Sequence, residues 1–339
     1  MKRALRYLAM FYLIALLGLW GLIHFDSGDF WQVTLFLFSP RWIVALPLIV
    51  LVPLTLAFDY RVTVVYLLHG LIILFPILGY RAAWSQAVEP SASSLKVMTY
   101  NLGGGTVSAD DLVALVVERE IDVLVLQECA SSLSKPVFEM LSWSRRQQSN
   151  IAVGSAFELG EMQILAVRLP KHYNIVAAVS CELRVPMDGA AVNRGASDSA
   201  EPTTVRIVDV HFPTFRPALE KVREFDLDAG VAIEEVGAQY NELVGPVRRQ
   251  LEKFEVPTIV AGDFNVPVES AFYRRHWSDY RNVLSSAGDG LRHTKHTRLH
   301  GIRIDHMLVD GHWSILSATV GPGLGGDHRP VIAELKLVR

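Results

Sequence analysis

Three long apolar runs lie within the first 80 residues, and they limit the possible folds more than any other feature of the chain. They cover about residues 7–23, 42–58 and 62–80, and each has the length that a helix needs to cross a bilayer core. A cleavable signal peptide is an alternative for the first run, but no small-residue cleavage site follows it before Asp26. Three such runs in succession argue against buried helices of a soluble domain, so we expect three transmembrane helices.

The basic residues that flank these runs indicate how the helices cross the membrane. Four of them would lie on the side of the N-terminus: Lys2, Arg3, Arg6 and Arg61. Arg41 and Arg81 would lie on the other side, and the side with more Lys and Arg is usually the cytoplasm. Trp31 and Phe38, between the first two runs, suit a segment at the membrane interface. We therefore expect a multi-pass protein of the plasma (inner) membrane whose remaining chain is extracytoplasmic.

The chain after the apolar runs is long enough to form a full globular core. We expect a membrane domain at residues 1–84, a linker at 85–94 and a globular domain at 95–339. Residues 1–90 hold six of the 32 Lys and Arg residues and four of the 35 Asp and Glu residues, which leaves a net charge of −5 after residue 90. Nonspecific binding of nucleic acids depends on clustered Lys and Arg, so this charge argues against it but still allows a small or headgroup phosphodiester as substrate.

The stretch Ile259–Pro267 joins a buried strand to a polar end. Its apolar start is typical of a buried strand, and Gly262 then allows a turn or a close approach. Asp263 and Asn265 lie two residues apart, so both would point the same way from the strand end. Such a carboxylate can orient a water or hold a metal, and the amide can donate hydrogen bonds to a phosphate. The alternative interpretation is an Asx-rich turn closed by a proline.

Polar residues also accompany other apolar segments that we interpret as strands, namely residues 95–100, 122–126, 205–210, 302–309 and 331–337. In α/β proteins, ligand sites gather at such strand ends. Asp305 differs because it lies in the middle of a predicted strand, where it must be paired or hydrogen-bonded. The complete polar set is Asn101, Glu128, His211, Asp263, Asn265, Asp305, Asp327 and His328.

Two histidines with several carboxylates suit metal-assisted hydrolysis of a phosphate ester. In that chemistry the metal neutralises phosphoryl charge, one group activates water and another protonates the leaving oxygen. A site without cysteine favours Mg²⁺ as the cofactor, with Mn²⁺ as an alternative. The spacing of His293, His296 and His300 could suggest zinc, but no Cys or carboxylate completes that set, so we expect a loop there. Cys129 and Cys181 are the only cysteines, and a packed free thiol is expected for Cys129.

The connecting segments predict the remaining elements. Residues 108–120 and 270–277 indicate helices, and residues 219–254 have helical periodicity that is interrupted near Gly245 and Pro246. Residues 187–203 are rich in Gly, Ala and Ser, which is typical of a flexible loop. Further strands are expected at residues 151–157, 162–167, 175–183 and 315–320.

Six short motifs carry a resemblance to a known family: TYN at 99–101, LQE at 126–128, DVHF at 209–212, GDFN at 262–265, RIDH at 303–306 and GDHRP at 326–330. In this order they resemble the endonuclease/exonuclease/phosphatase superfamily, the fold of pancreatic deoxyribonuclease, apurinic endonuclease and neutral sphingomyelinase. The resemblance implies a four-layer α/β sandwich, in which two packed mixed β-sheets are flanked by helices, after the three transmembrane helices. It also implies a hydrolase of phosphate esters.

The resemblance assigns roles at the metal and at the attacking water. Glu128 would be the principal metal ligand, with Asn101 and Asp327 helping at the metal or the phosphate. Asp263 would position or deprotonate the attacking water. Asn265 would hold the scissile phosphate.

The resemblance also implies roles for the remaining polar residues. His328, oriented by Asp305, would contact the phosphate or act as a base, and His211 would be the leaving-group acid or would stabilise the transition state. The chain departs from the family pattern in two places, because Gly326 replaces the usual Ser and residues 151–157 lack a Ser-Arg pair. The second departure affects the expected substrate contacts.

The sequence leaves the substrate class open. We expect a membrane-anchored, metal-dependent phosphoesterase that acts on a phosphodiester or phosphomonoester, of either nuclease or lipid-headgroup type. The alternative is a membrane-anchored module of the same fold that binds a partner or a phosphorylated ligand without turnover. The expected partners are the substrate and the lipid bilayer, and no obligate protein partner is inferred.

Overall fold

The structure is a computed structural model that describes residues 1–26, 28, 30–82, 94–103, 107–168, 175–186 and 202–338. Residues 85–93 of the predicted linker at 85–94, and most of the predicted loop at 187–203, therefore lie outside the described residues. In the described part of the chain, three helices are long and apolar enough to cross a membrane. They are α1 (Lys2–Phe25), η1 with α3 (Arg41–Ala45 and Leu46–Phe58), and α4 with η2 (Tyr60–Ile72 and Ile73–Ile77).

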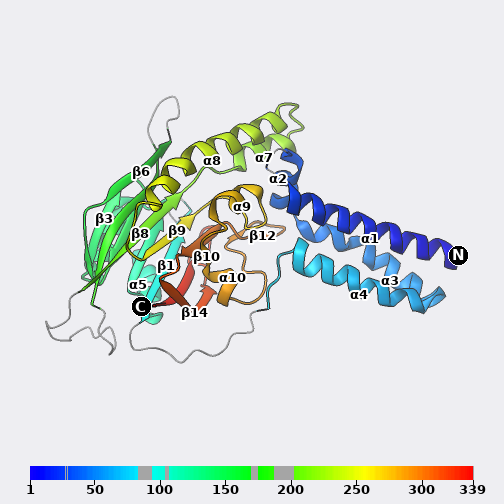
Figure 1. Ribbon diagram of the computed structural model, residues 1–339, viewed down its shortest axis with the longest axis horizontal. Helices are drawn as coiled ribbons and strands as arrows, with labels where there is room; N and C mark the ends of the chain where they lie inside the picture. Colours follow the sequence, from blue (N-terminus) through cyan, green and yellow to red (C-terminus); the bar gives the residue numbers. More distant parts are fainter. Residues whose placement is uncertain are drawn as a thin grey trace.

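These helices form a bundle that extends away from the globular part of the molecule (Figure 1). Arg6 Nε lies 2.8 Å from Asp59 Oδ2, which holds the start of α1 beside the turn between α3 and α4. Large apolar side chains remain exposed along the bundle, including Phe11 at 71%, Ile49 at 69% and Leu67 at 69%. Exposed apolar surface of this extent is typical of a face that contacts lipid or another protein.

A short helix, α2 (Trp31–Phe38), connects the bundle to the globular part. Its residues Trp31, Leu35 and Phe38 pack against the apolar cluster beneath helix α8 (Ala229–Leu251). Arg41 Nη1 lies 3.4 Å from Glu269 Oε2 and adds an ion pair at the same junction. The segment with Trp31 and Phe38, which the sequence predicts to lie at the membrane interface, therefore contacts the globular part of the protein on one side.

The first sheet has six strands in the order β14-β15-β1-β2-β4-β3. Its strands are β1 (Ser94–Asn101), β2 (Val123–Gln127), β3 (Ser144–Gln148), β4 (Ile151–Ser155), β14 (Trp313–Val320) and β15 (Val331–Leu337). β1 and β2 are parallel and the other pairs are antiparallel. β3 was not predicted, because its sequence SRRQQ has no apolar alternation, and it lies at the edge of the sheet. The outer face is covered by two helices, α5 (Ala109–Glu118) and α6 (Ser131–Met140).

The second sheet has seven strands in the order β10-β13-β9-β8-β7-β5, with β6 also paired to β7. Its strands are β5 (Glu158–Leu159), β6 (Gln163–Arg168), β7 (Ile175–Val185), β8 (Thr203–His211), β9 (Thr258–Asp263), β10 (Arg281–Asn282) and β13 (Asp305–Val309). α8, α7 (Arg216–Arg223) and α9 (Ala271–Trp277) lie on its outer face. The other elements are α10 (Val283–Ala287) and a small sheet of β11 (Lys295–His296) and β12 (Gly301–Ile302).

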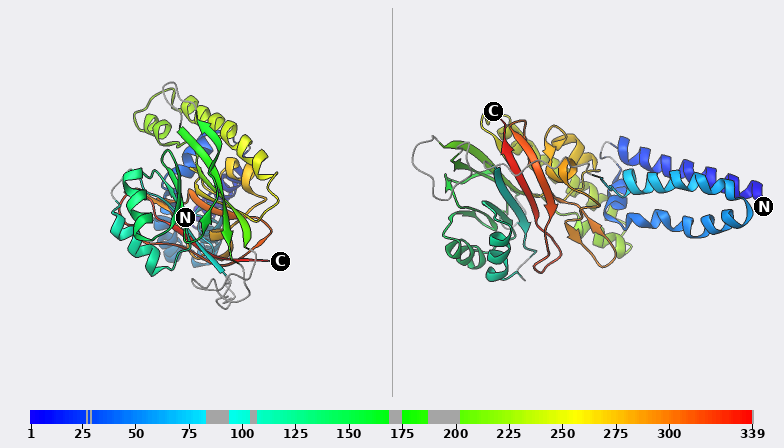
Figure 2. Two further views of the ribbon diagram at one scale, coloured as in Figure 1. Left: turned by 90° about the vertical axis from the view of Figure 1, so that its left-hand side faces the viewer. Right: turned by 90° about the horizontal axis from the view of Figure 1, so that it is seen from below.

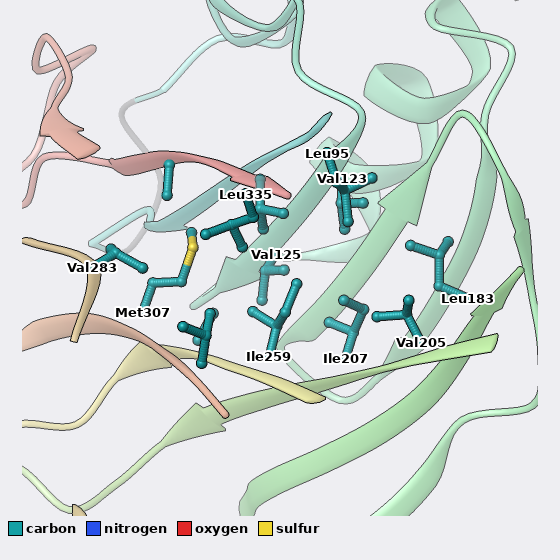
Figure 3. Close-up of a cluster of buried hydrophobic side chains, with 14 of the residues drawn as sticks. Leu95, Val123, Val125, Leu183, Val205, Ile207, Ile259, Val283, Met307 and Leu335 are labelled. Carbon is teal, nitrogen blue, oxygen red and sulfur yellow. The ribbon is translucent and has the colours of Figure 1, made fainter. Parts of the chain in front are cut away.

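The inner faces of the two sheets pack against each other around one apolar core (Figures 2 and 3). Val123 and Val125 of the first sheet belong to the same buried cluster as Ile207, Ile259 and Met307 of the second sheet. Helices on both outer faces complete a four-layer α/β sandwich, which confirms the predicted fold class.

Two details differ from the sequence prediction. The break in the helical segment lies between α7 and α8, where Phe225 adopts a φ of 57°, and not at Pro246, which α8 accommodates within its length. Asp305 is the first residue of β13 and not its middle residue, because Arg303 and Ile304 are outside the strand. Asp305 therefore lies at a strand end, as the other predicted acids do.

Candidate active site

The ends of strands from both sheets surround a cavity of about 210 Å³. Six of the eight predicted site residues line it: Glu128, His211, Asp263, Asn265, Asp327 and His328. The other two lie directly behind it, because Asn101 donates a hydrogen bond to Asp263 and Asp305 accepts one from His328. The structure thus brings all eight predicted residues together.

The GDFN segment turns sharply at the end of β9. Gly262 has a φ of 136°, a conformation that side chains rarely adopt. Asn265 has a φ of 53°, and its backbone N–H donates to Asp263 Oδ1 at 2.8 Å. Asn265 Nδ2 donates to the backbone oxygen of Phe212 at 2.9 Å. Since an amide has two N–H donors, the second remains available for a ligand in the cavity.

Asn101, at the end of β1, connects two of the acids. Its Nδ2 donates to Asp263 Oδ2 at 2.9 Å and lies 3.4 Å from Glu128 Oε1. Asn101 Oδ1 accepts a hydrogen bond from Gly103 N at 2.9 Å. Burial raises the pKa of Asp263, and the nearby charge of Asp305 raises it further, although His328 and other cations oppose this. Asp263 is therefore a better proton acceptor than an ordinary aspartate.

Glu128 and His211 lie at the ends of β2 and β8. Glu128 has a φ of 51°, an uncommon backbone conformation that directs its carboxylate into the cavity. His211 Nε2 lies 3.6 Å from Glu128 Oε1, while His211 Nδ1 is buried with no hydrogen-bond partner. In the described part of the chain, Glu128 makes no ion pair with a Lys or Arg side chain.

His328 and Asp305 form a buried pair beside the cavity. His328 Nδ1 donates to the Asp305 carboxylate at 3.0 Å, and both side chains are about 2% exposed or less. Burial lowers the pKa of His328, but the attraction of Asp305 and Asp263 outweighs this effect and raises the pKa to about 9. The pKa of Asp305 is lowered because the attraction of His328 outweighs the effect of burial.

Lys295 and Arg216 are two cationic residues of the cavity that sequence reasoning did not identify. Lys295 Nζ lies 2.6 Å from His328 Nε2 and 3.2 Å from Asp327 Oδ2, and Arg216 Nη2 lies 2.6 Å from the same Asp327 oxygen. The Lys295 ammonium can donate to His328 Nε2 only while that nitrogen carries no proton. Protonation of His328 Nε2, which its raised pKa favours, therefore competes with this contact.

These cations lower the pKa of Asp327. Burial alone would raise it, but the attraction of Lys295, His328 and Arg216 is stronger. Neither Lys295 nor Arg216 follows an apolar strand, so the pattern that identified the acids could not identify them.

Two groups of side chains could hold a metal ion. Asp263, Asp305 and His328 offer ligand atoms within 4.8 Å of one another. However, His328 Nδ1 already donates to Asp305, so a metal there would have to break that pair. Glu128 offers a carboxylate without a Lys or Arg partner among the described residues, and a cation bound there would leave the pair of His328 and Asp305 intact. The Glu128 side of the cavity therefore fits a hard divalent cation better.

Gly103 and Asp327 complete the Glu128 side. Gly103 has a φ of 57°, and a Cβ atom built there would lie 3.3 Å from Asp327 Oδ1. The glycine thus keeps this carboxylate oxygen open toward the cavity. Gly104 and Gly105, the next two residues of the chain, lie outside the described residues.

His293, His296 and His300 lie in and beside the short strand β11, and they do not form a metal group with acids or cysteines within the described residues. The rings of His293 and His296 lie 6.2 Å apart, but His300 Nε2 contacts the backbone oxygen of Phe38 at 3.0 Å. The cysteines are free and buried, and burial raises the pKa of Cys129 to about 12. Cys129 is therefore an unreactive packed thiol.

His306 gives a prediction about stability against pH. Burial, followed by repulsion from Arg303, lowers the pKa of His306 to about 4, and its ring contacts Val266 O at 2.8 Å and Asn282 Nδ2 at 3.3 Å. Between pH 6.5 and about 4 the unfolded chain binds a proton that folded His306 rejects, so stability falls as pH falls. We expect this residue to account for a loss of about 3 kcal/mol over that interval.

Denaturant titrations at pH 7 and pH 4.5 test this expectation when wild type is compared with His306→Gln. Glutamine retains one donor and one acceptor but does not titrate, so the variant should lose less stability on acidification. Equal pH dependence in the two proteins would contradict the assignment.

Two mixed sheets packed face to face, with acids, amides and imidazoles gathered around one cavity at their strand ends, define an α/β-sandwich protein with a polar site at the edge of its sheets. Residues 98–328 match the model of the Endonuclease/Exonuclease/phosphatase family. The chain belongs to this family.

Solved structures share the fold at low sequence identity. Truncated TDP2 from Caenorhabditis elegans has a TM-score of 0.50 at 16% identity, over 73% of this chain and 99% of that chain. The human Nocturnin catalytic domain with bound sulfate has a TM-score of 0.48 at 15% identity, over 74% and 97% of the two chains. A mannosyl-6-phosphatase from Bacteroides thetaiotaomicron has a TM-score of 0.48 at 14% identity, over 71% and 99%. A search of curated protein sequences gave no significant match.

Proposed function

We propose that this chain is a membrane-anchored, metal-dependent phosphoesterase whose catalytic part lies outside the cytoplasm. Members of its family hydrolyse phosphate esters and generally use divalent metal ions, and one relative in structure is a mannosyl-6-phosphatase. The observation that carries the proposal is the convergence of the eight predicted polar residues on one cavity. A binding module without turnover would be free to lose some of these residues, so their joint presence favours an enzyme.

The metal in this proposal is Mg²⁺ or Mn²⁺, held by Glu128 with Asn101 and Asp327 close to it. A bound cation would neutralise negative charge on the phosphate during the reaction. Asn101 orients Glu128 through Nδ2, and Arg216 and Lys295 fix one oxygen of Asp327 and leave the other toward the cavity.

The remaining residues bind the phosphate and move protons. Asp263 accepts a proton from the attacking water, which its raised pKa supports. The free N–H of Asn265 Nδ2 and the Nε2 of His328 bind phosphate oxygens. Asp305 fixes the orientation of His328, and His211 supplies a proton to the leaving oxygen or stabilises the transition state.

The orientation in the membrane follows from the two ends of the helix bundle. The ion pair between Arg6 and Asp59 places the N-terminus and the α3–α4 turn together at the end far from the globular part (Figure 1). That end also carries Lys2, Arg3 and Arg61, so it is the cytoplasmic end in this proposal.

Hydrolysis of bis(p-nitrophenyl) phosphate and p-nitrophenyl phosphate by the purified full-length protein tests the proposal. We expect release of p-nitrophenolate with Mg²⁺ or Mn²⁺, loss of at least about 100-fold in rate with EDTA, and recovery when the cation is restored. Sealed right-side-out vesicles should hydrolyse these impermeant esters without detergent. Absence of hydrolysis of both esters, or rates that ignore EDTA, would contradict the proposed activity, and activity that requires detergent would contradict the orientation.

A further inference from the structure

A second, larger cavity adjoins the proposed catalytic site. This groove has a volume of about 810 Å³ and shares Thr214, Arg216, Asn265, Lys295 and Asp327 with the catalytic cavity. The shared residues make the two cavities continuous. A ligand bound at the catalytic residues can therefore extend into the groove.

The walls of the groove away from the catalytic residues carry many apolar side chains. They include Leu35 and Phe38 of α2, Leu219 and Val222 of α7, and Leu299 of the loop between β11 and β12. Leu299 is 68% exposed, so its side chain is accessible to an apolar ligand in the groove. A cavity with one polar, cationic end and one apolar end suits an amphipathic ligand.

The apolar end of the groove lies next to the membrane helices. Trp42 Nε1, in the first turn of the second apolar helix, donates to Leu299 O at 3.1 Å. His300 Nε2 contacts Phe38 O at 3.0 Å, so the same loop also touches α2. Figure 1 shows α2 and α7 close together at the base of the bundle, where the bilayer surface would lie.

We propose that this groove holds the hydrocarbon chain of a membrane lipid whose phosphate ester reaches the catalytic cavity. The proposal rests on the proposed phosphoesterase activity and names its substrate class as a lipid phosphate ester. Arg216 and Lys295, where the cavities meet, attract the anionic headgroup, while α2, α7 and the Leu299 loop surround the chain. The globular part has a net negative charge, which argues against the phosphate backbone of a nucleic acid as the ligand.

A series of alkyl p-nitrophenyl phosphates tests the proposal on the full-length protein. Every member is a phosphodiester with the same p-nitrophenolate leaving group, so only the length of the alkyl chain varies. Each methylene buried in the groove adds roughly a fourfold gain, so burial of only about two of the additional methylenes of the octyl ester would raise kcat/KM above that of the methyl ester by on the order of tenfold or more. Leu299→Trp fills the groove and should reduce this octyl-to-methyl ratio severalfold. Leu227→Trp is the matched control, because Leu227 is 99% exposed and outside the groove, and its ratio should equal that of wild type.

A binding measurement separates this inference from the proposed activity. Octylphosphonate and methylphosphonate cannot be hydrolysed at the same bond, so their affinities report on the groove without turnover. Tighter binding of octylphosphonate by wild type than by Leu299→Trp would support the groove. If the same protein hydrolysed no ester, that result would overturn only the proposed activity. Equal affinities of wild type for the two phosphonates would overturn the lipid proposal. It would also be overturned if Leu227→Trp changed the octyl-to-methyl ratio of kcat/KM as much as Leu299→Trp does. Both results leave the phosphoesterase activity in place.

Discussion

Replacing Glu128 by glutamine is expected to lower kcat/KM for phosphate esters by about 10³-fold, with little change in the stability of the fold. The Glu128 carboxylate makes no ion pair with Lys or Arg among the described residues, and its side chain is 36% exposed. Glutamine keeps the size and one oxygen but removes the charge that holds a divalent cation. A bound cation contributes several kcal/mol of charge stabilisation in the transition state. Its loss corresponds to about 10³-fold in rate, since each 1.36 kcal/mol is about tenfold.

Steady-state kinetics with saturating Mg²⁺ measure this effect, and thermal unfolding of the same samples measures stability. Glu139→Gln is the matched control, because Glu139 is a solvent-exposed glutamate on α6 that contacts Lys135. The control should retain the activity of wild type. Wild-type activity in the Glu128 variant, or an equal loss in both variants, would remove Glu128 from the proposed role.

Replacing Gly262 by alanine is expected to prevent the chain from folding. A Cβ atom at this position would lie 2.1 Å from the backbone oxygen of Val210 and 2.9 Å from its backbone nitrogen. Val210 and Gly262 are partners in the parallel pairing of β8 and β9, so neither backbone can move without separating the two central strands. The φ of 136° adds strain for any side chain. The cost should exceed about 4 kcal/mol, a large share of the stability of a typical domain.

Expression of soluble, monodisperse protein in detergent and denaturant titration measure the effect. Gly311→Ala is the control, because no atom lies within 4 Å of the Cβ position of Gly311. The control should unfold within about 0.5 kcal/mol of wild type. A Gly262 variant as stable as the control would show that the close approach of β8 and β9 is not required.

The catalytic candidates could be predicted from the sequence because each polar residue is next to an apolar strand. His211 and Asp263 are paired neighbours in β8 and β9, so two strand ends that are 52 residues apart in sequence are adjacent in the sheet. The order of the six motifs along the chain predicted the fold, through its resemblance to a known family. The geometry that joins them, such as the contact between Asn101 Nδ2 and Asp263, required the structure.

Other features could not be predicted because they depend on tertiary contacts. Lys295 lies on a short strand and Arg216 begins a helix, and neither position has a local pattern that marks a ligand site. Pro246 suggested a helix break, but α8 continues through it, while the actual break has no Gly or Pro. The groove beside α2 combines segments more than 200 residues apart, as Trp42 and Leu299 show.

The most direct test of the central claim is Mn²⁺ binding, measured by electron paramagnetic resonance on the full-length protein. We expect wild type to remove free Mn²⁺ from solution, Mg²⁺ to compete for it, and Glu128→Gln to bind it at least about tenfold more weakly. The control Glu139→Gln should bind Mn²⁺ as wild type does. Equal Mn²⁺ binding by wild type and Glu128→Gln, or no binding by wild type, would contradict a metal-dependent site at the ends of these strands.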